Sequence, residues 1–165
     1  MLSRTASSLV RRATARAFSS EAAAPASGKM TLNFSLPDET VYAGAEVDQV
    51  IVPGEAGEYG ITANHVPIVS ELKAGVLQIL HGDGEPEKYF VSGGFALTHD
   101  DSSTDISCPV AVKLDDLDSS AVSSNYDAAK SAFASAEAGS IAQAEAQIEM
   151  DVNKSMGSAL GLNLS

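Results

Sequence analysis

The feature that most constrains the fold is a change of residue pattern near position 114. From 29 to 113, short runs of alternating apolar and polar residues are separated by turn clusters such as Gly82-Asp83-Gly84. Runs of this length and spacing predict an antiparallel β-sandwich or barrel. From Leu117 onward the chain contains no Pro, and Ala and Ser predominate. The sequence therefore predicts a β-sandwich domain over 29–113 followed by a helical hairpin domain over 114–165.

Two amphipathic stripes predict the two helices of the hairpin. The first stripe consists of Val122, Tyr126, Ala129, Phe133 and Ala136, and the second of Ile141, Ala144, Ile148, Val152 and Met156. Asp118 or Ser119 is expected to cap the first helix, Gly139 to end it, and Ser140 to cap the second. Isolated helices of this length are marginal in water, so the hairpin must pack against the sandwich or against another protein. The sequence leaves both possibilities open.

The first 18 residues differ in charge from the rest of the chain. All of the arginines lie here (Arg4, Arg11, Arg12 and Arg16), and the first acidic residue is Glu21. A basic, amphipathic, acid-free segment predicts a mitochondrial or plastid transit peptide over 1–18. Arg16-Ala17-Phe18-Ser19 resembles a mitochondrial processing site, which favours mitochondria. Residues 19–28 are rich in Ser, Ala, Pro and Gly and predict a flexible lead.

The remaining chain is strongly acidic. Six Lys against 22 acidic residues give it a net charge of −16 once residues 1–18 are removed. Phosphate backbones and anionic lipid headgroups are bound mainly by Lys and Arg, so a nucleic-acid or direct membrane role is disfavoured. No apolar stretch approaches the length of a membrane span, so we expect membrane association only through partners. The acidity fits either a well-solvated surface or a basic protein partner.

The sequence predicts no catalytic residue, no cofactor and no metal site. His65, His81 and His99 lack the spacing of metal ligands, and the one cysteine, Cys108, is expected to be a small buried residue. A triad of Ser92, His99 and Asp105 has the required residue types, but the Gly-x-Ser-x-Gly motif of a nucleophilic serine is absent.

A glycine-rich segment is the richest local feature of the chain. Gly54, Gly57 and Gly60 recur at a spacing of three, as in loops that bind phosphate, but Glu55 and Glu58 would repel a phosphate. We expect instead a loop that presents two carboxylates on an exposed tip. The alternative is a turn-rich crossover between two sheets. His65-Val66-Pro67 follows as a turn-forming segment before the next strand.

Two segments at a fixed separation resemble a known family. Val52–Val76, which contains the glycine-rich segment, and Tyr89-Phe90-Val91-Ser92-Gly93-Gly94-Phe95-Ala96 are similar to motifs of the F-type ATP synthase stalk subunit family, called delta in mitochondria and epsilon in bacteria. The helical segment Ala144–Glu149 also resembles mitochondrial members. The resemblance extends from about Met30 to Leu160 in family order.

The resemblance implies a ten-stranded antiparallel β-sandwich followed by a C-terminal antiparallel α-helical hairpin. It also implies a non-catalytic rotor subunit at the foot of the central stalk, on the matrix side of the mitochondrial inner membrane. The expected partners are the gamma subunit, the c-ring and the small mitochondrial epsilon subunit. By motif match, the expected c-ring interface is Glu55, Gly57, Glu58 and Tyr59, and the expected gamma interface is His65, Val66 and Pro67.

One departure from the family pattern bears on ligands. Some bacterial members bind ATP through an Asp-x-x-Arg pattern, where this chain has Asp127-Ala128-Ala129-Lys130. Lys is a poorer bidentate phosphate partner than Arg, so we expect no nucleotide binding. Two other functions remain open from sequence: an acidic β-sandwich adaptor or chaperone of the mitochondrial matrix, and a small hydrolase that uses His65 or His99.

Overall fold

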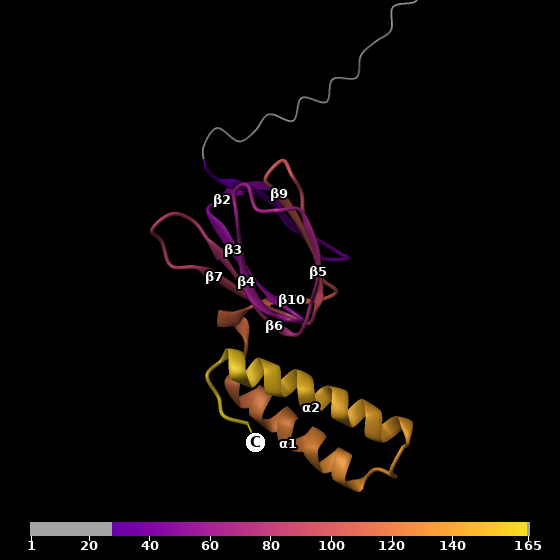
Figure 1. The fold of residues 1–165 in the computed structure, drawn as a ribbon. Helices are drawn as coiled ribbons and strands as arrows, with labels where there is room; N and C mark the ends of the chain where they lie inside the picture. The colour runs from indigo at the N-terminus through magenta and orange to yellow at the C-terminus, as the bar shows by residue number, and fades with distance from the viewer. Residues whose placement is uncertain (1–27, 165) are drawn as a thin grey trace, which may run out of the picture.

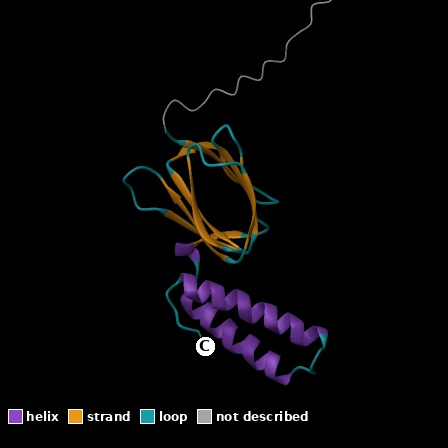
Figure 2. Cartoon of the chain, viewed as in Figure 1, coloured by secondary structure: helices purple, strands orange, loops and turns teal. Residues whose placement is uncertain are grey.

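The computed structural model describes residues 28–164, so the predicted transit peptide 1–18 and nearly all of the predicted lead 19–28 lie outside the described residues. Ten strands precede a short 3-10 helix and two α-helices in this part of the chain (Figure 1; Figure 2). In order they are β1 (Met30–Ser35), β2 (Thr40–Val47), β3 (Gln49–Gly54), β4 (Gly57–Thr62), β5 (Ile68–Leu72), β6 (Gly75–Leu80), β7 (Glu87–Val91), β8 (Gly94–Thr98), β9 (Ser103–Ser107), β10 (Ala111–Lys113), η1 (Leu114–Asp116), α1 (Ser119–Ser135) and α2 (Ile141–Ala159).

The strands form two layers that are joined at one corner. One layer has the order β4-β3-β6-β7-β10, and the other has the order β5-β8-β9-β1-β2. The layers connect where Gly54 of β3 pairs with Leu72 of β5. The predicted ten-stranded sandwich with a helical hairpin is confirmed. One pairing differs from the expected antiparallel arrangement, because β1 and β9 run parallel. The long intervening chain lets β1 join β9 in this direction, which a tight hairpin turn could not do.

The core lies between the layers and consists of the inward-facing residues of alternating strands. Phe34 of β1 meets Tyr89 of β7 edge-on, with ring centroids 5.7 Å apart, and so connects the two layers. The layers are also joined where the Tyr42 hydroxyl of β2 donates a hydrogen bond to Glu87 of β7 at 2.9 Å. Burial of each large apolar side chain stabilises the fold by about 1.5–3 kcal/mol. The fully buried residues with large side chains are Phe34, Phe90, Met30, Leu32, Ile61, Leu77, Ile79, Ile106, Val47, Val50, Val52 and Val91.

The glycine-rich segment is a β-hairpin, so the prediction of a loop over Glu55–Tyr59 is wrong. Only Glu55 and Ala56 form the turn between β3 and β4, because Gly54 already pairs with Gly57. A side chain at Gly54 would lie 2.8 Å from the Gly57 carbonyl oxygen and 3.1 Å from the Tyr59 ring. Gly57 has a φ of +139°, which L-residues rarely adopt. These glycines therefore allow a tight turn between two strands.

The two helices form the predicted antiparallel hairpin. Asp118 caps α1 by accepting hydrogen bonds from the backbone N–H groups of Ser120 and Ala121, and Ser140 caps α2 by accepting from Gln143. These two caps confirm the sequence predictions. Gly139 does not end α1: the helix stops at Ser135, and Gly139, with a φ of +79°, lies in the turn.

Both predicted helices exist, but their stripes differ in burial: the first faces inward, and most of the second is exposed, with only Val152 and Met156 half-buried. Val122, Tyr126 and Ala129 are buried, but Ile141 and Ile148 of α2 are 79% and 63% exposed. The buried residues of α2 are Ala146 and Gly157, which are three helical turns apart. Gly157 is covered by the C-terminal residues Leu162 and Leu164, which leave no room for a side chain there. The hairpin therefore packs mainly on itself, and α2 contacts the sandwich at the β6 side (Figure 1).

Candidate protein-binding surfaces

The turn between β3 and β4 presents an acidic tip at one end of the sandwich. We define the acidic tip as Glu55, Gly57 and Glu58; Glu55 and Glu58 are exposed and Gly57 is half-buried. The tip is fixed to the other layer, because the Glu55 N–H donates to the Glu71 carbonyl at 3.0 Å and the Lys73 N–H donates to the Pro53 carbonyl at 2.9 Å. The carboxylates are therefore held on a rigid support.

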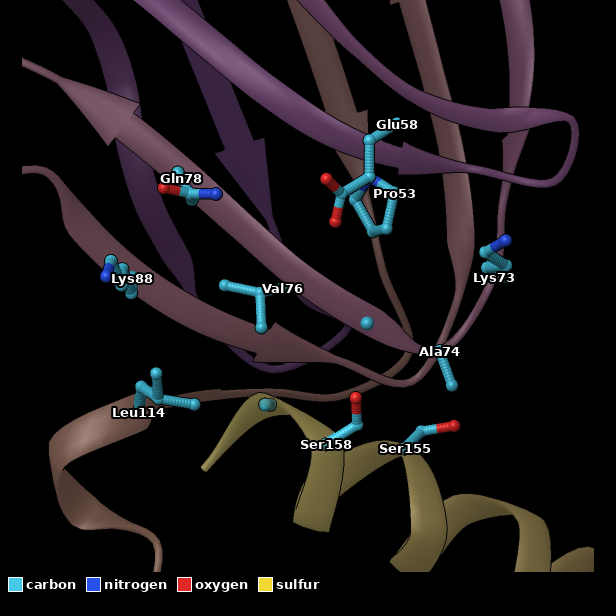
Figure 3. A pocket seen from close by; sticks show the side chains of 12 residues that line it. Pro53, Glu58, Lys73, Ala74, Val76, Gln78, Lys88, Leu114, Ser155 and Ser158 are labelled. Carbon is cyan, nitrogen blue, oxygen red and sulfur yellow. The ribbon is translucent and has the colours of Figure 1, made fainter. Parts of the chain in front are cut away.

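Glu58 also lines a groove between the sandwich and the hairpin. The groove has a volume of about 400 Å³ and lies between the strand ends and the last turns of α2. Figure 3 shows Pro53 and Glu58 above the groove and Ser155 and Ser158 of α2 below it. Its lining mixes one carboxylate with Lys73 and Lys88. The groove is shaped by both parts of the chain, so it depends on how the hairpin is seated.

Tyr59 occupies a different environment from the rest of the predicted c-ring segment. Its ring packs against the hydrophobic core and lies 6.3 Å from the ring of His65, measured between centroids. The Tyr59 hydroxyl is enclosed and has no hydrogen-bond partner among the described residues. The Tyr59–His65 contact joins the two predicted interfaces, which are adjacent in space.

The predicted gamma segment connects β4 to β5. His65 is half-buried, whereas Val66 is 68% exposed and Pro67 is exposed. The segment is held in place because the Asn64 N–H donates to the buried Ser102 hydroxyl at 2.8 Å. The structure thus presents Val66 and Pro67 on a fixed loop and not on a free one.

An apolar patch that the sequence analysis missed continues from this segment onto the outer face of β5 and β8. We define the outer patch as Val69, Phe95 and Leu97. Val69 is paired with Leu97, and Phe95 is paired with Glu71, so these side chains share one face. Val69 is 71% exposed and Phe95 is 53% exposed. The sequence did contain a signal for this patch, because both strands carry apolar residues on both faces. Leu72 and Ala96 fill the inner face, so the remaining apolar residues must lie on the outer one. This exposed apolar group is a candidate interaction surface.

A polar network borders the outer patch. Asn33 donates to Asp105 at 2.7 Å, and a ring nitrogen of His99 lies 2.8 Å from the other carboxylate oxygen of Asp105. The predicted pair of His99 and Asp105 therefore exists. Ser92 is not part of it, because Ser92 precedes β8 while His99 follows it, and the Ser92 hydroxyl donates to the Val110 carbonyl. The hydrogen bonds of Asn33, Asp105 and His99 connect neighbouring strands on the outer face, but they do not form a catalytic triad with Ser92.

The network makes stability depend on pH through Asp105. The Asn33 amide, followed by His99, holds the pKa of Asp105 below its usual value of 3.8. The carboxylate's contribution is therefore present above pH 3.8 and is lost as the pH falls through the lowered pKa. Between about pH 5 and pH 2.5, the natural chain should lose more free energy of unfolding than Asp105→Asn. We expect a difference of at most about 1 kcal/mol, because the carboxylate is half-exposed.

Urea unfolding of both chains across that pH range measures the difference. Equal losses in the two chains would show that these hydrogen bonds do not favour the ionised carboxylate.

The described part of the chain has neither a metal-binding cluster nor a helix suited to crossing a membrane. Residues 28–164 contain no group of three or more His, Cys, Asp or Glu that could hold a metal ion. Neither described helix has the length and apolar character needed to cross a membrane. Cys108 is buried, as predicted, and burial raises the pKa of its thiol to about 11. Its thiolate is therefore scarce at neutral pH.

Comparison with known proteins identifies the family. The model of the ATP synthase delta/epsilon chain β-sandwich domain matches residues 29–113. The chain is 44% identical over 147 residues to the mitochondrial ATP synthase subunit delta of Eremothecium gossypii. The match covers 88% of this chain and 89% of that protein.

Two solved structures share the fold. One is a chain of the Euglena gracilis mitochondrial ATP synthase, from a structure of OSCP, F1 and c-ring. It has a TM-score of 0.74 and 24% identity, and the match covers 81% of this chain and 82% of that one. The other belongs to the central stalk and c-ring of the Tetrahymena thermophila enzyme, with a TM-score of 0.57 and 14% identity over 79% and 96% of the two chains. The family model, the identity with the Eremothecium protein and the shared sandwich and hairpin agree: the chain belongs to the delta/epsilon family of ATP synthase subunits, among its mitochondrial delta members.

Proposed function

We propose that this chain fastens the c-ring to the gamma subunit, so that rotation of the ring is transmitted to the catalytic head. As a mitochondrial delta-type member of its family, it is a non-catalytic subunit of the ATP synthase central stalk, on the matrix side. The observation that carries the coupling proposal is the pair of surfaces on one rigid sandwich. An acidic tip lies at one end, and an exposed apolar patch lies on an outer face.

The acidic tip is the proposed contact with the c-ring. Glu55 and Glu58 are exposed, and Glu55 is tied to β5 by its backbone N–H. Because the backbone of the tip is already fixed, binding need not order a loop, which suits a contact that must transmit force. Gly57 has no side chain, and no atom lies within 4 Å of the place where a Cβ would be. A partner can therefore approach the backbone of the tip closely. Tyr59, which is half-buried, packs against the core beneath the tip and lies at the margin of the proposed contact.

The outer patch, together with His65, Val66 and Pro67, is the proposed contact with the gamma subunit. Its exposed apolar side chains would be buried in the complex, and buried aromatic residues such as Phe95 often dominate binding energy. Continuity between Val66, Pro67 and Val69 supports a single interface. The flanking Asp105 and Glu71 suit Lys or Arg residues at its rim.

The outward face of α2 is the proposed contact with the small epsilon subunit. Ile141 and Ile148 lie seven residues apart and are both exposed, so they form one apolar stripe along the helix. A partner that binds this stripe would stabilise the folded hairpin. In this proposal, residues 1–18 are removed on import, residues 29–113 form the gripping domain, and residues 114–165 form the hairpin.

Charge reversal at the tip tests the c-ring contact. In Glu58→Lys, retention of the catalytic head on the c-ring should fall several-fold at low ionic strength, and less at high salt, because salt screens exposed charges. Retention is measured by the fraction of head released from washed membranes. Glu39→Lys, which reverses an exposed charge in the turn between β1 and β2, is the matched control and should leave retention unchanged. Equal retention of the two variants at low salt would remove Glu58 from the interface.

A further inference from the structure

The outer edge of β4 is an unpaired strand edge. The Pro53 carbonyl bonds to Lys73 on the β5 side, and Pro53 is opposite Glu58 in the β3–β4 pair. The pair of Pro53 and Glu58 is therefore a non-hydrogen-bonded pair, and hydrogen-bonded and non-hydrogen-bonded pairs alternate along antiparallel strands. It follows that Glu58, Gly60 and Thr62 direct their N–H and C=O groups away from β3.

Nearly all of these edge groups lack a partner. The Thr62 carbonyl accepts from the His65 N–H at 3.2 Å, which leaves the N–H groups of all three residues and the carbonyls of Glu58 and Gly60 without a hydrogen bond in residues 28–164. Glu58 and Thr62 are exposed and Gly60 is half-buried, so the edge is accessible from outside. An exposed row of unpaired backbone groups is a template for another strand.

Four strands lie at the ends of the two layers, and three of them are protected at least in part. One end of β5 is covered by β3, through the pair of Gly54 and Leu72 and the bond from the Glu55 N–H to the Glu71 carbonyl. β10 has only three residues and ends in Lys113, and β2 is distorted by two irregularities in its pairing with β1. Short edge strands, lysines and bulges are devices that prevent strand addition. β4 is six residues long, pairs with β3 in unbroken register, and contains neither Lys nor Pro. It is therefore the edge best suited to accept a strand.

We propose that the free edge of β4 binds an extended segment of a neighbouring rotor subunit, which adds a strand beside Glu58–Thr62 and carries Lys or Arg opposite Glu58. This inference rests on the proposed function. Main-chain hydrogen bonds to three N–H and two C=O groups supply the affinity, and the carboxylate of Glu58 at the end of the edge supplies the charge preference. Alternate side chains of the added strand cover Tyr59, whose enclosed hydroxyl has no partner in the described chain.

A basic segment fits this edge better than a second copy of the chain does. The edge is continuous with the acidic tip, because Glu58 belongs to both. A second copy would bring together two chains that each have a net charge of −16 after residues 1–18 are removed. Like charges of this size oppose self-association.

Hydrogen exchange at single amides tests the proposal with an internal control. The isolated chain and the assembled ATP synthase are compared by mass spectrometry with electron-transfer fragmentation. On assembly, exchange at Gly60 and Thr62 should slow at least about tenfold, since their N–H groups become hydrogen-bonded. Tyr59 and Ile61, whose N–H groups face β3, should be protected in both samples. Fast exchange at Gly60 and Thr62 in the assembled enzyme would overturn the proposal.

A substitution at the edge gives a second test. Thr62→Pro removes one edge N–H without removing a bond to β3, and Thr62→Val preserves the N–H. In competition for assembly, the Pro variant should be incorporated several-fold less than the Val variant, while both isolated chains unfold at similar temperatures. Equal incorporation would contradict the strand-addition model. If the Pro variant does not fold, the hydrogen-exchange result decides.

The outcomes separate this inference from the proposed function. A chain that assembles normally but leaves its edge amides exposed retains its coupling role and loses the added strand. A chain that is absent from the assembled enzyme contradicts the proposed function itself. Protection that appears in the isolated chain and increases with its concentration would identify a second copy as the occupant and overturn the proposal.

Discussion

Gly94→Ala is expected to destabilise the sandwich by about 2–5 kcal/mol, which is a large part of the stability of an ordinary domain. Gly94 has a φ of +140°, so a side chain there strains the backbone. A Cβ atom at this position would also lie 3.0 Å from the Cys108 Cα atom and closer still to the Ser107 carbonyl oxygen. Both neighbours are backbone atoms of the adjacent chain segment and cannot move without shifting it. Urea unfolding of the purified chain measures the loss.

Gly57→Ala is the matched control for this prediction. Its φ of +139° is nearly the same, but nothing lies within 4 Å of a Cβ atom built there. The control therefore has the backbone strain of the first variant without its collisions, and should cost about 1–3 kcal/mol. Equal destabilisation of the two variants would show that the close approach at Gly94 contributes nothing.

The result would also explain one of the two motifs that carried the family resemblance. Gly94 pairs with Leu72, at the same corner where β5 meets β3 and the two layers join. The Ser92-Gly93-Gly94 turn is required there because the strands approach too closely for a side chain. Its glycines serve the packing of the sandwich and not a chemical reaction.

The periodicity of the sequence predicted the larger parts of the fold. Short alternating runs over 29–113 identified the β-rich part, and the spacing of Val122, Tyr126 and Ala129 identified the first helix. Asp118 and Ser140 marked two helix starts, because short polar side chains can accept from the free N–H groups of a first turn. These features depend on neighbours close in sequence, which is why the sequence alone reveals them.

The parts that were predicted wrongly depend on contacts between distant residues. β4 contains Gly57 and Gly60 and so lacks the composition of a strand, but Gly60 pairs with Ile51 of β3 and the side chain of Gln49 lies against it. On α2, Ile141 and Ile148 had the right spacing but face outward, whereas Ala146 is the residue of this helix that is buried beside them. Periodicity shows that an apolar face exists but does not show what covers it.

The candidate surfaces also divide into those that the sequence predicted and those that depend on contacts between distant residues. Motif matches placed Glu55, Glu58 and Val66 at exposed positions, but gave Tyr59 no internal role. The outer patch was missed because each of its members occurs in a strand that also supplies the core. Only the register between β5 and β8 shows that Val69, Phe95 and Leu97 share one outer face.

Phe95→Asp is expected to weaken binding of the gamma subunit by about 2–4 kcal/mol, or about 30-fold to several hundred-fold in Kd. Phe95 lies on the outer patch with 53% of its surface exposed, so its replacement removes little of the core. The introduced carboxylate would be buried in the complex without a partner, in addition to the lost aromatic contact. Binding of the chain to immobilised gamma subunit measures the change.

Ile148→Asp is the control, because it makes the same change of character at a residue that is 63% exposed on α2. Its affinity for the gamma subunit should stay close to that of the natural chain, since the proposed gamma interface lies on the sandwich. Ile148→Asp should unfold at nearly the natural temperature. Phe95→Asp should unfold somewhat below it, because its carboxylate lies opposite Glu71, so binding is measured well below both unfolding temperatures. Equal affinity of Phe95→Asp and the natural chain would exclude the outer patch from the interface. An equal loss in both variants would mean that the gamma subunit contacts the hairpin as well, and that the sandwich alone does not make the connection.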